Sequence, residues 1–232
     1  MSGPRVSVDY FFFIFAKLTI MADNYLERRE EALRSSGRTV VRRNTPSLDT
    51  LLRRNRSHRA YDTSYVVAMR QLETIAGVNT KLPSGRNAQT LRFKLLDAAG
   101  GGEGFCSLLH LGGFLPELHL PVPGTEPKTF IVVCSTEPES PVVDIDLGIS
   151  LQSMALKAVE IGLNALIIRA FNRQEVKAAL DLRLEPLAVL AVGKGTERIE
   201  LDEVGAGSDL RYFRSADGVH HVPKLRMEDI LL

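Results

Sequence analysis

Residues 144–171 read DIDLGISLQSMALKAVEIGLNALIIRAF, and this stretch decides the fold. In its first part, apolar residues recur every three or four positions, which predicts an amphipathic helix from Asp144 to Gly162. The apolar stripe consists of Leu147, Leu151, Met154, Ala155, Ala158 and Ile161. The pattern then changes to an apolar run over Asn164–Phe171, which predicts a strand. A long amphipathic helix followed at once by a strand indicates helices packed on a sheet.

Further apolar runs extend this sheet on both sides of the deciding stretch. Phe130–Cys134 and Leu187–Val192 have the composition of strands buried on both faces, and Leu91–Leu96 predicts a shorter strand. Three additional helices are predicted. Ser47 caps the first, and the third runs from Asn172 to Leu182. The second begins at Thr63 or Ser64, and its apolar residues are Val66, Val67, Met69, Leu72 and Ile75. The interspersed elements indicate the α+β class, with three α/β/α layers around a mixed sheet of four or five strands.

The sequence is organised as one domain, residues 47–232, preceded by an N-terminal extension, residues 1–46. Within the extension, residues 10–20 read YFFFIFAKLTI. This run is shorter than the roughly 20 apolar residues that a membrane-spanning helix needs, and Lys17 interrupts it. Three interpretations of residues 1–20 stay open: a misassigned start upstream of Met21, a weak signal-like segment or lipid-surface anchor, and a segment of unknown role.

The composition of the 232-residue chain argues against several classes of function. Its 29 basic and 28 acidic side chains give a net charge of +1, which provides no general attraction to nucleic acid. Two cysteines, Cys106 and Cys134, are too few for a disulfide framework or a zinc cluster, and they predict a reducing, cytoplasmic location. Because the apolar run at residues 10–20 is too short to span a membrane, we expect no membrane partner. The sequence also lacks the phosphate-loop, HExxH, CxxC and GxSxG motifs, so we expect no metal site and no side-chain nucleophile.

A basic cluster at residues 55–61, NRSHRAY, is the first candidate for binding. It places Arg56, Ser57 and Arg59 within four residues, on a turn where all three could converge on one anion. Guanidinium groups and a hydroxyl suit the oxygens of a phosphate. Taken alone, the cluster could equally be a solvated helix end, where arginines complement the helix dipole.

Two more polar clusters follow along the chain. Residues 83–89, PSGRNAQ, offer hydrogen-bonding side chains on a loop that could meet the edge of a planar heteroaromatic ring. Residues 222–226, VPKLR, place Lys224 and Arg226 on one side of an extended segment, because alternate residues of a strand point the same way. Taken singly, these clusters could be an ordinary loop and a basic tail.

In this order, the three clusters resemble the motifs of the FMN-dependent nitroreductase family. The opening motif of that family, approximately Arg-Arg-Ser-x-Arg-x-Phe, stands here as residues 55–61, and its Pro-Ser-x-x-Asn-x-Gln-Pro segment is similar to residues 83–90. Residues 144–171 resemble its central helix and strand, residues 186–197 its strand ending in Gly-x-Pro, and the VPKLR segment its terminal basic clamp. The resemblance covers residues 48–232, with departures from the family pattern at Asn55, Thr90, Arg169 and Gly195.

The resemblance implies an FMN site at the interface of a homodimer. Arg56, Ser57 and Arg59 would hold the phosphate and the polar edge of the flavin, and Lys224 and Arg226 would complete the phosphate site. The loop at residues 83–89 would approach the flavin from the partner subunit, and the end of the strand at residues 164–171 would line the ring. The residues concerned are Ser84, Arg86, Asn87 and Gln89 in the loop and Ile168, Arg169 and Ala170 at the strand end.

The resemblance further implies an oxidoreductase with a ping-pong mechanism. NADH or NADPH would reduce the flavin at N5, and a nitroaromatic, quinone or similar small acceptor would then reoxidise it. Two alternatives stay open. The Gly- and Pro-rich middle, residues 98–127, which could also form a lid, is compatible with a flavin-binding protein of storage or regulation that has little turnover. The departures at Asn55, Thr90 and Arg169 are compatible with a dimeric scaffold that binds no flavin.

Overall fold

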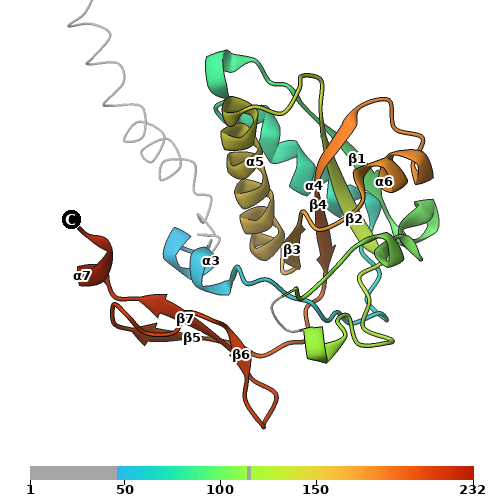
Figure 1. Cartoon of the computed structure of the whole chain (residues 1–232). Helices are drawn as coiled ribbons and strands as arrows, with labels where there is room; N and C mark the ends of the chain where they lie inside the picture. Colours follow the sequence, from blue (N-terminus) through green and yellow to red (C-terminus); the bar gives the residue numbers. More distant parts are fainter. Residues whose placement is uncertain (1–45, 114–115) are drawn as a thin grey trace, which may run out of the picture. The chain divides into compact units, whose positions relative to one another are not determined.

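The computed structural model describes residues 46–113 and 116–232 (Figure 1). Residues Pro46–Leu232 form one compact unit. The predicted extension, with the apolar segment at residues 10–20, lies outside the described residues except for Pro46. The described helices are α3 (Leu48–Arg54), α4 (Met69–Ala76), α5 (Pro141–Glu160), α6 (Arg173–Ala179) and α7 (Met227–Ile230). The strands are β1 (Leu91–Leu96), β2 (Thr129–Ser135), β3 (Asn164–Ile168), β4 (Glu185–Gly193), β5 (Ile199–Val204), β6 (Phe213–Arg214) and β7 (His220–Leu225).

Within the described residues, four strands form the central sheet in the order β1-β2-β4-β3. Every neighbouring pair is antiparallel, and the register sets Ile131 of β2 opposite Leu190 of β4, which in turn lies opposite Ile167 of β3. β2 is buried along its whole length, as its apolar sequence predicts. β4 is buried from its second residue onward.

Helices and turns cover both faces of this sheet. Alternate residues of β2 and β4 point to opposite faces, so each strand contributes to two cores. Towards α4 and α5, the core contains Leu72, Ile75, Ile131, Val133, Leu147, Met154, Leu190 and Val192. Towards α6 and the short 3₁₀ turn Phe105–Leu108, it contains Phe105, Phe130, Val132, Val176, Val189 and Ala191. The predicted α+β class with three layers is therefore confirmed.

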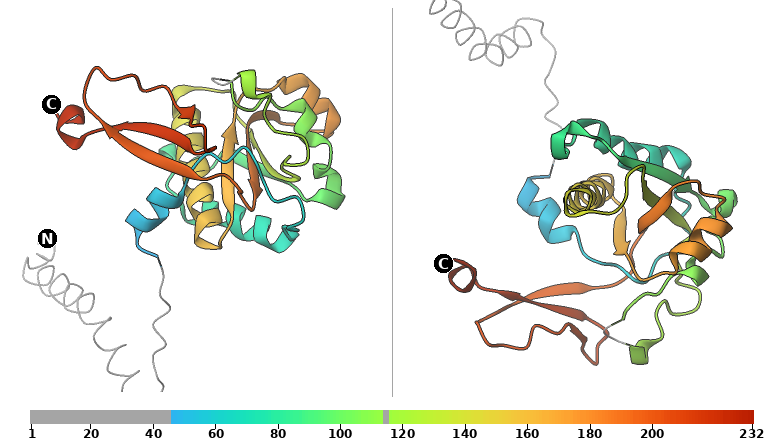
Figure 2. Two further views of the ribbon diagram at one scale, coloured as in Figure 1. Left: turned by 90° about the horizontal axis from the view of Figure 1, so that it is seen from below. Right: turned by 45° about the horizontal axis from the view of Figure 1, so that its top comes forward.

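The pairing differs from the expected mixed sheet in one respect: the central sheet is antiparallel throughout. For the pair of β3 and β4, the length of α6 explains the antiparallel direction. A helix of 7 residues spans only about 10 Å, so it cannot carry the chain back along β3, and β4 starts at the end of the sheet where β3 finished. Mixed pairing occurs instead in a second sheet of order β5-β7-β6, where β5 and β7 are parallel and β6 and β7 antiparallel. Figure 2 shows this sheet extending from the central sheet to α7.

The long helix α5 begins three residues before the predicted start and ends two before the predicted end. Ser140 caps its first turn by accepting a hydrogen bond from the N–H of Val143 at 3.4 Å, and Pro141 occupies the first helical position, which favours proline. The last helical residue is Glu160, and two residues later Gly162 has a φ of 82°, a left-handed conformation that glycine adopts without strain and that stops the helix. α5 therefore runs the length of the sheet and leads directly into β3.

The helix predicted from residue 63 or 64 begins later, at Met69, so that prediction is wrong at its start. The carboxylate of Asp62 accepts hydrogen bonds from the backbone N–H of Ser64 at 3.0 Å and from its hydroxyl at 2.6 Å, which folds this segment into a turn. Val66 consequently lies outside the helix and is 79% exposed. The other predicted strands and helices are present, with ends that shift by up to three residues.

We predict that Leu190→Ala lowers the free energy of unfolding by about 2–5 kcal/mol, because Leu190 is fully buried in the α5-facing core and the change leaves a cavity. The matched control is Leu201→Ala in β5, where the side chain is 41% exposed and the expected loss is about 0.5 kcal/mol. Urea unfolding followed by circular dichroism measures both. Equal losses for the two variants would contradict this placement of the core.

Candidate functional site

A cavity of about 360 Å³ is lined by residues of α3, β3, α5 and the second sheet. We call it the basic cavity. Four of the residues predicted to bind an anion line it together: Arg56, Ser57, Arg59 and Lys224. The other lining residues are Leu52, Asn55, Gln152, Ala155, Ala165, Ile167, Ile199, Tyr212, His220 and Val222. Two clusters separated by more than 160 residues in sequence therefore meet at one site.

The end of α3 and the edge of β3 position the basic turn, residues 56–59. Ser47 caps the start of α3, and its last turn closes where the N–H of Asn55 donates to the carbonyl of Leu51 at 2.9 Å. Ser57 then forms a parallel bridge with Ala165 of β3. The turn consequently runs along the edge of the central sheet, beside the cavity.

The guanidinium groups of the turn keep unused donors. Arg56 donates from Nη2 to the carbonyl of Leu52 at 2.6 Å, and Arg59 donates from Nη1 to the carbonyl of Ser57 at 3.2 Å. In both residues Nε is buried and has no partner within the described part of the chain. Burial lowers the pKa of Arg56 from its ordinary value. Buried cationic donors without partners are suited to an oxyanion.

A buried carboxylate holds the turn from its other side. Glu197, whose side chain is 5% exposed, accepts hydrogen bonds through Oε2 from the backbone N–H of Arg59 and, at 3.2 Å, from that of Ala60. Its Oε1 accepts from Nη2 of Arg214 in β6. Glu197 thus connects the basic turn to the second sheet, which also carries Lys224.

His58, the middle residue of the turn, points into the protein and is 7% exposed. Its Nε2 lies 3.1 Å from the side-chain nitrogen of Asn164, whose oxygen accepts the N–H of Gly195 at 3.0 Å. The Asn164 nitrogen must therefore donate to Nε2, which places the imidazole proton on Nδ1, 4.0 Å from Glu197. Burial lowers the pKa of His58 and outweighs the raising effect of Glu197.

An aromatic pair completes the wall of the cavity. Tyr212 lies with its ring centroid 5.1 Å from that of His220 and 5.0 Å from the guanidinium carbon of Arg59, within range of a cation–π contact. His220 is 2% exposed, and its Nδ1 has no hydrogen-bond partner within the described residues. Burial is the main cause that lowers the pKa of His220, and Arg59 lowers it further.

The predicted loop at residues 83–89 lies at a different cavity, of about 240 Å³, which we call the loop cavity. Ser84 and Gln89 line it, and Arg86 and Asn87 lie in the same loop but do not. The loop is fixed to α5, because the N–H of Gly85 donates to the buried carboxylate of Asp146 at 2.8 Å. The two cavities share no lining residue, so one chain does not bring the loop to the basic turn.

The backbone of this loop is strained. Arg86, Asn87 and Gln89 have φ values of 55°, 55° and 49°, in the left-handed region that residues other than glycine rarely adopt. Each such residue costs of the order of 1 kcal/mol or more, and such strain is found mainly where the surrounding structure needs it, often at binding sites. The observation supports a binding role for the loop.

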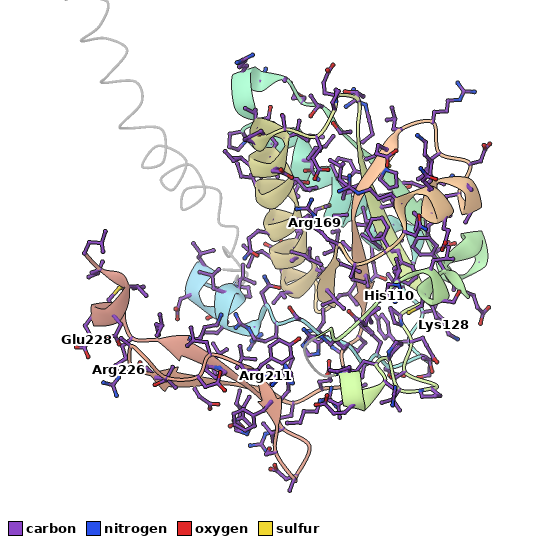
Figure 3. All side chains as sticks on the ribbon, viewed as in Figure 1. His110, Lys128, Arg169, Arg211, Arg226 and Glu228 are labelled. Carbon is purple, nitrogen blue, oxygen red and sulfur yellow. The ribbon has the colours of Figure 1, made fainter. Side chains whose placement is uncertain are left out.

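The predicted strand-end residues lie outside the basic cavity. Ile168 is the last residue of β3, and its side chain is buried in the α6-facing core. Arg169 pairs with Glu139 at 2.5 Å and with Asp144 at 3.7 Å, at the start of α5 (Figure 3). Ala170 accepts the N–H of His110 at 2.9 Å through its carbonyl.

Arg226 also lies outside the cavity. It follows β7 directly and approaches Glu203 at 3.8 Å and Glu228 at 3.6 Å. Figure 3 shows Arg226 near Glu228 and far from Arg169. Of the predicted basic pair at the end of the chain, Lys224 therefore joins the basic turn, whereas Arg226 lies beside acidic side chains.

Sequence reasoning missed several lining residues, and two of them left a signal. Ala165 and Ile167 line the cavity, while Leu166 and Ile168 belong to the α6-facing core. Side chains along a strand point alternately to its two faces. Counting by twos from Ala165 would therefore have predicted that Ile167, and not Ile168, lines the cavity. Tyr212 and His220 carry no comparable signal, because the second sheet brings them to the cavity.

Other chemistry in the described residues is structural. Asp202, His221 and Ser215 are arranged like a hydrolase triad, with 2.9 Å from Asp202 to Nδ1 and 3.2 Å from Nε2 to the serine oxygen. The hydroxyl of Ser215, however, lies 2.6 Å from the carboxylate of Asp217, which can only accept its proton, and none of the triad residues lines either cavity. Burial raises the pKa of each free cysteine thiol to about 11.

The described residues lack two features, a cluster of metal ligands and a helix that could span a membrane. Residues 46–113 and 116–232 contain no group of three or more His, Cys, Asp or Glu side chains that could hold a metal ion. In the same ranges, no helix has the length and the apolar character needed to cross a bilayer.

The comparisons with known proteins agree with the observed architecture. Residues 115–194 match the sequence model of the Nitroreductase family. No curated protein matches the chain. A nitroreductase family protein of Streptococcus pneumoniae TIGR4 has a similar structure, with a TM-score of 0.54 and 15% identity over 66% of this chain and 93% of that one.

Two further solved structures are similar. One is a nitroreductase of Exiguobacterium sibiricum in complex with FMN, with a TM-score of 0.53 and 18% identity over 66% of this chain and 90% of that one. The other is a mutant of the FMN- and NADPH-dependent nitroreductase NfnB of Sphigopyxis sp. strain HMH, with a TM-score of 0.51 and 22% identity over 65% and 88%. At these identities the likeness establishes the fold. With the family match, it confirms the resemblance to the nitroreductase family.

The two buried histidines of the site predict a pH dependence of stability. Their pKa values are lowered in the folded chain, so the unfolded chain binds more protons below the ordinary histidine pKa of about 6.5. The stability that these two neutral histidines contribute should therefore be fully present above pH 6.5. It should decline as the pH falls towards their pKa values in the folded chain. Urea unfolding at pH 7.5 and pH 5.5 measures this decline.

The variant His220→Gln should make the decline smaller, because one of the two histidines no longer titrates. The control His110→Gln changes an exposed histidine and should leave the decline as in the wild type. If the free energy of unfolding of His220→Gln falls between pH 7.5 and pH 5.5 by as much as that of the wild type, burial of the His220 imidazole does not cause the decline.

Proposed function

We propose, from the confirmed resemblance to the nitroreductase family, that this chain is an FMN-dependent oxidoreductase. Hydride would pass from NADH or NADPH to the flavin and then to a nitroaromatic, quinone or similar small acceptor. The observation that carries the proposal is the basic cavity, where Arg56, Ser57, Arg59 and Lys224 meet. The proposal assigns the FMN phosphate to these four residues.

The donors of the cavity fit a phosphate group. The buried Nε atoms of Arg56 and Arg59 have no partner in the described structure, and Lys224 adds a third cation. A phosphate monoester carries a charge near −2 and offers three acceptor oxygens, so it can use these donors and balance most of their charge. Ser57 adds a hydroxyl on the same turn.

The neutral part of the cavity fits the remainder of the cofactor. Asn55 and Gln152, joined by a hydrogen bond of 3.4 Å, present amides suited to hydroxyl groups. Ala165 and Ile167 offer an apolar edge along β3, and β3 leads towards Arg169 and Ala170, where the resemblance expects the flavin ring. FMN, when bound, supplies the hydride chemistry, while this chain binds and orients it.

The separation of the two cavities supports a homodimer. The loop with Ser84, Arg86, Asn87 and Gln89 lies at the loop cavity, which shares no residue with the basic cavity. A second copy of the chain could bring this loop to the flavin, as the resemblance implies. We propose a site shared between two subunits, in which the strained loop contacts the flavin across the interface.

The free cysteines agree with the proposed cellular location. Cys106 and Cys134 are both buried and unpaired, as expected in a reducing compartment. We propose that the enzyme acts in the cytoplasm, where NADH and NADPH are available.

The first experiment is an anaerobic absorption titration. We expect the purified protein to show flavin bands, or to acquire them with added FMN, and we expect NADH or NADPH to bleach them. Bleaching followed by fast reoxidation with an added quinone or nitroaromatic supports the enzyme. Bleaching without acceptor-dependent turnover favours the storage or regulatory alternative, and a protein that refuses added FMN contradicts the proposal.

We predict that Arg56→Ala and Lys224→Ala each weaken FMN binding roughly 10–100-fold, because each removes a charge-assisted hydrogen bond worth about 1.5–3 kcal/mol. Quenching of flavin fluorescence measures the affinity. The matched control is Arg70→Ala, which removes an exposed arginine of α4 and should change the affinity less than twofold. A variant at position 56 or 224 with wild-type affinity removes that residue from the proposed phosphate site.

A further inference from the structure

Glu197 does not line the basic cavity, yet it holds the turn that does. Its two carboxylate oxygens have separate tasks. Oε2 accepts two consecutive backbone N–H groups, those of Arg59 and Ala60, while Oε1 accepts the guanidinium of Arg214. The side chain is 5% exposed, so these bonds form in a region from which water is largely excluded.

We infer that Glu197 is a positioning residue for phosphate binding: it fixes the basic turn so that Arg56 and Arg59 face the cavity, and it supplies the resident counter-charge. The inference rests on the proposed function, because the anion concerned is the phosphate of FMN. Glu197 is the last residue of the segment, residues 186–197, that resembles a family strand, but the resemblance gave this side chain no role. The positioning role follows from the hydrogen bonds of one buried side chain.

The direction of the backbone at the turn supports the inference. Two consecutive N–H groups that point to the same carboxylate fix the peptide planes at residues 59 and 60. Ser57, two residues earlier, is fixed separately by its bridge to Ala165. The turn is thus held at both ends, and the side chains of Arg56 and Arg59 are left to the cavity.

The charges support the second part of the inference. Arg56, Arg59 and Lys224 line one cavity, Arg214 lies beside the turn, and like charges at short range repel one another. Glu197 pairs with the guanidinium of Arg214 and accepts the backbone N–H of Arg59, so its negative charge lies next to this group. It therefore lowers the cost of assembling the cations before the anion arrives.

A glutamine at this position would keep the shape, but it would lose the negative charge and could keep only one of the two sets of hydrogen bonds. An amide has one oxygen and one NH2 group, so it can satisfy either the two backbone N–H groups or Arg214, and its own hydrogens would face donors on the other side. Unpaired buried donors are costly, and the turn should shift to relieve them. The effect should fall on the phosphate, which the turn binds, and not on the flavin ring.

The experiment compares FMN with riboflavin, which differs from FMN only by lacking the phosphate. We expect the wild-type chain to bind FMN at least about tenfold more tightly than riboflavin. Glu197→Gln should lose this preference while riboflavin affinity stays within about twofold. The control is Glu200→Gln in β5, which removes a carboxylate that is 44% exposed and pairs with Arg198 at 2.5 Å. It should keep the wild-type preference.

Two outcomes overturn the inference: a Glu197→Gln variant that retains the FMN preference, and one that loses FMN and riboflavin affinity equally, as for a merely structural residue. If the wild type binds neither flavin, the proposed function fails separately. Inorganic phosphate is then the probe, through its effect on the melting temperature. If phosphate raises the melting temperature of the wild type but not that of Glu197→Gln, the inference is supported. If phosphate raises both melting temperatures equally, the inference is overturned.

Discussion

The buried carboxylate of Glu197 is the interaction on which the site depends. It connects the turn after α3 to the second sheet, and a backbone hydrogen bond from the N–H of Thr196 to the carbonyl of Ala60, at 3.1 Å, lies beside it. Burying a carboxylate is costly unless its oxygens are fully used, and here backbone N–H groups and a guanidinium use them. The same contacts that make this burial affordable bring Lys224 and His220 into place opposite Arg56. A cavity with several cations is therefore a consequence of how the second sheet attaches.

Helix α5 is the second constraint, because it serves both cavities at once. Asp146 and Ser150 face the loop cavity, and Gln152 and Ala155 face the basic cavity. Residues at these spacings lie on different faces of a helix, so α5 separates the two groups of polar residues within one chain. A ligand that used both groups would have to take them from two copies. The geometry of α5 is therefore compatible with the proposed shared site.

Much of the fold could be predicted because its signals are local. The buried strands β2 and β4 are short apolar runs, and α5 has a clear apolar stripe and a capping serine. The predicted start of α4 was wrong because Asp62 and Ser64 form a turn through their side chains. In the sequence, such residues look the same as those that cap a helix. The antiparallel pairing of β3 and β4 depends on the length of α6, and sequence patterns locate the ends of a helix only to within a few residues.

The candidate site was predictable only where its residues form recognisable clusters. Arg56, Ser57, Arg59 and Lys224 were named from sequence, and they line one cavity. Tertiary structure brings Tyr212 and His220 to that cavity, and it brings Glu197 to the turn beside it. The sequence patterns gave none of these three residues a role. Ile168 was expected at the ring, but the alternation of β3 turns its side chain into the core and gives Ile167 to the cavity.

The departures from the family pattern bear on whether the chain retains a working site. A Cβ atom at Gly195 would lie 2.3 Å from Nδ1 of His58, so the placement of the buried histidine requires a glycine at this position. Asn55 has a partner in Gln152, and Arg169 has one in Glu139. Thr90 is the exception, because its buried hydroxyl oxygen has no partner among the described residues.

Decay of an unused site would leave unmatched changes, whereas three of these four departures are matched by a residue elsewhere in the chain. The matched positions also surround the basic turn or continue β3, where a bound flavin would lie. The departures therefore do not disrupt the local packing at these three positions, which is compatible with the proposed flavin site. The ion pair of Arg169 gives the end of β3 different contacts from those that the family pattern implies.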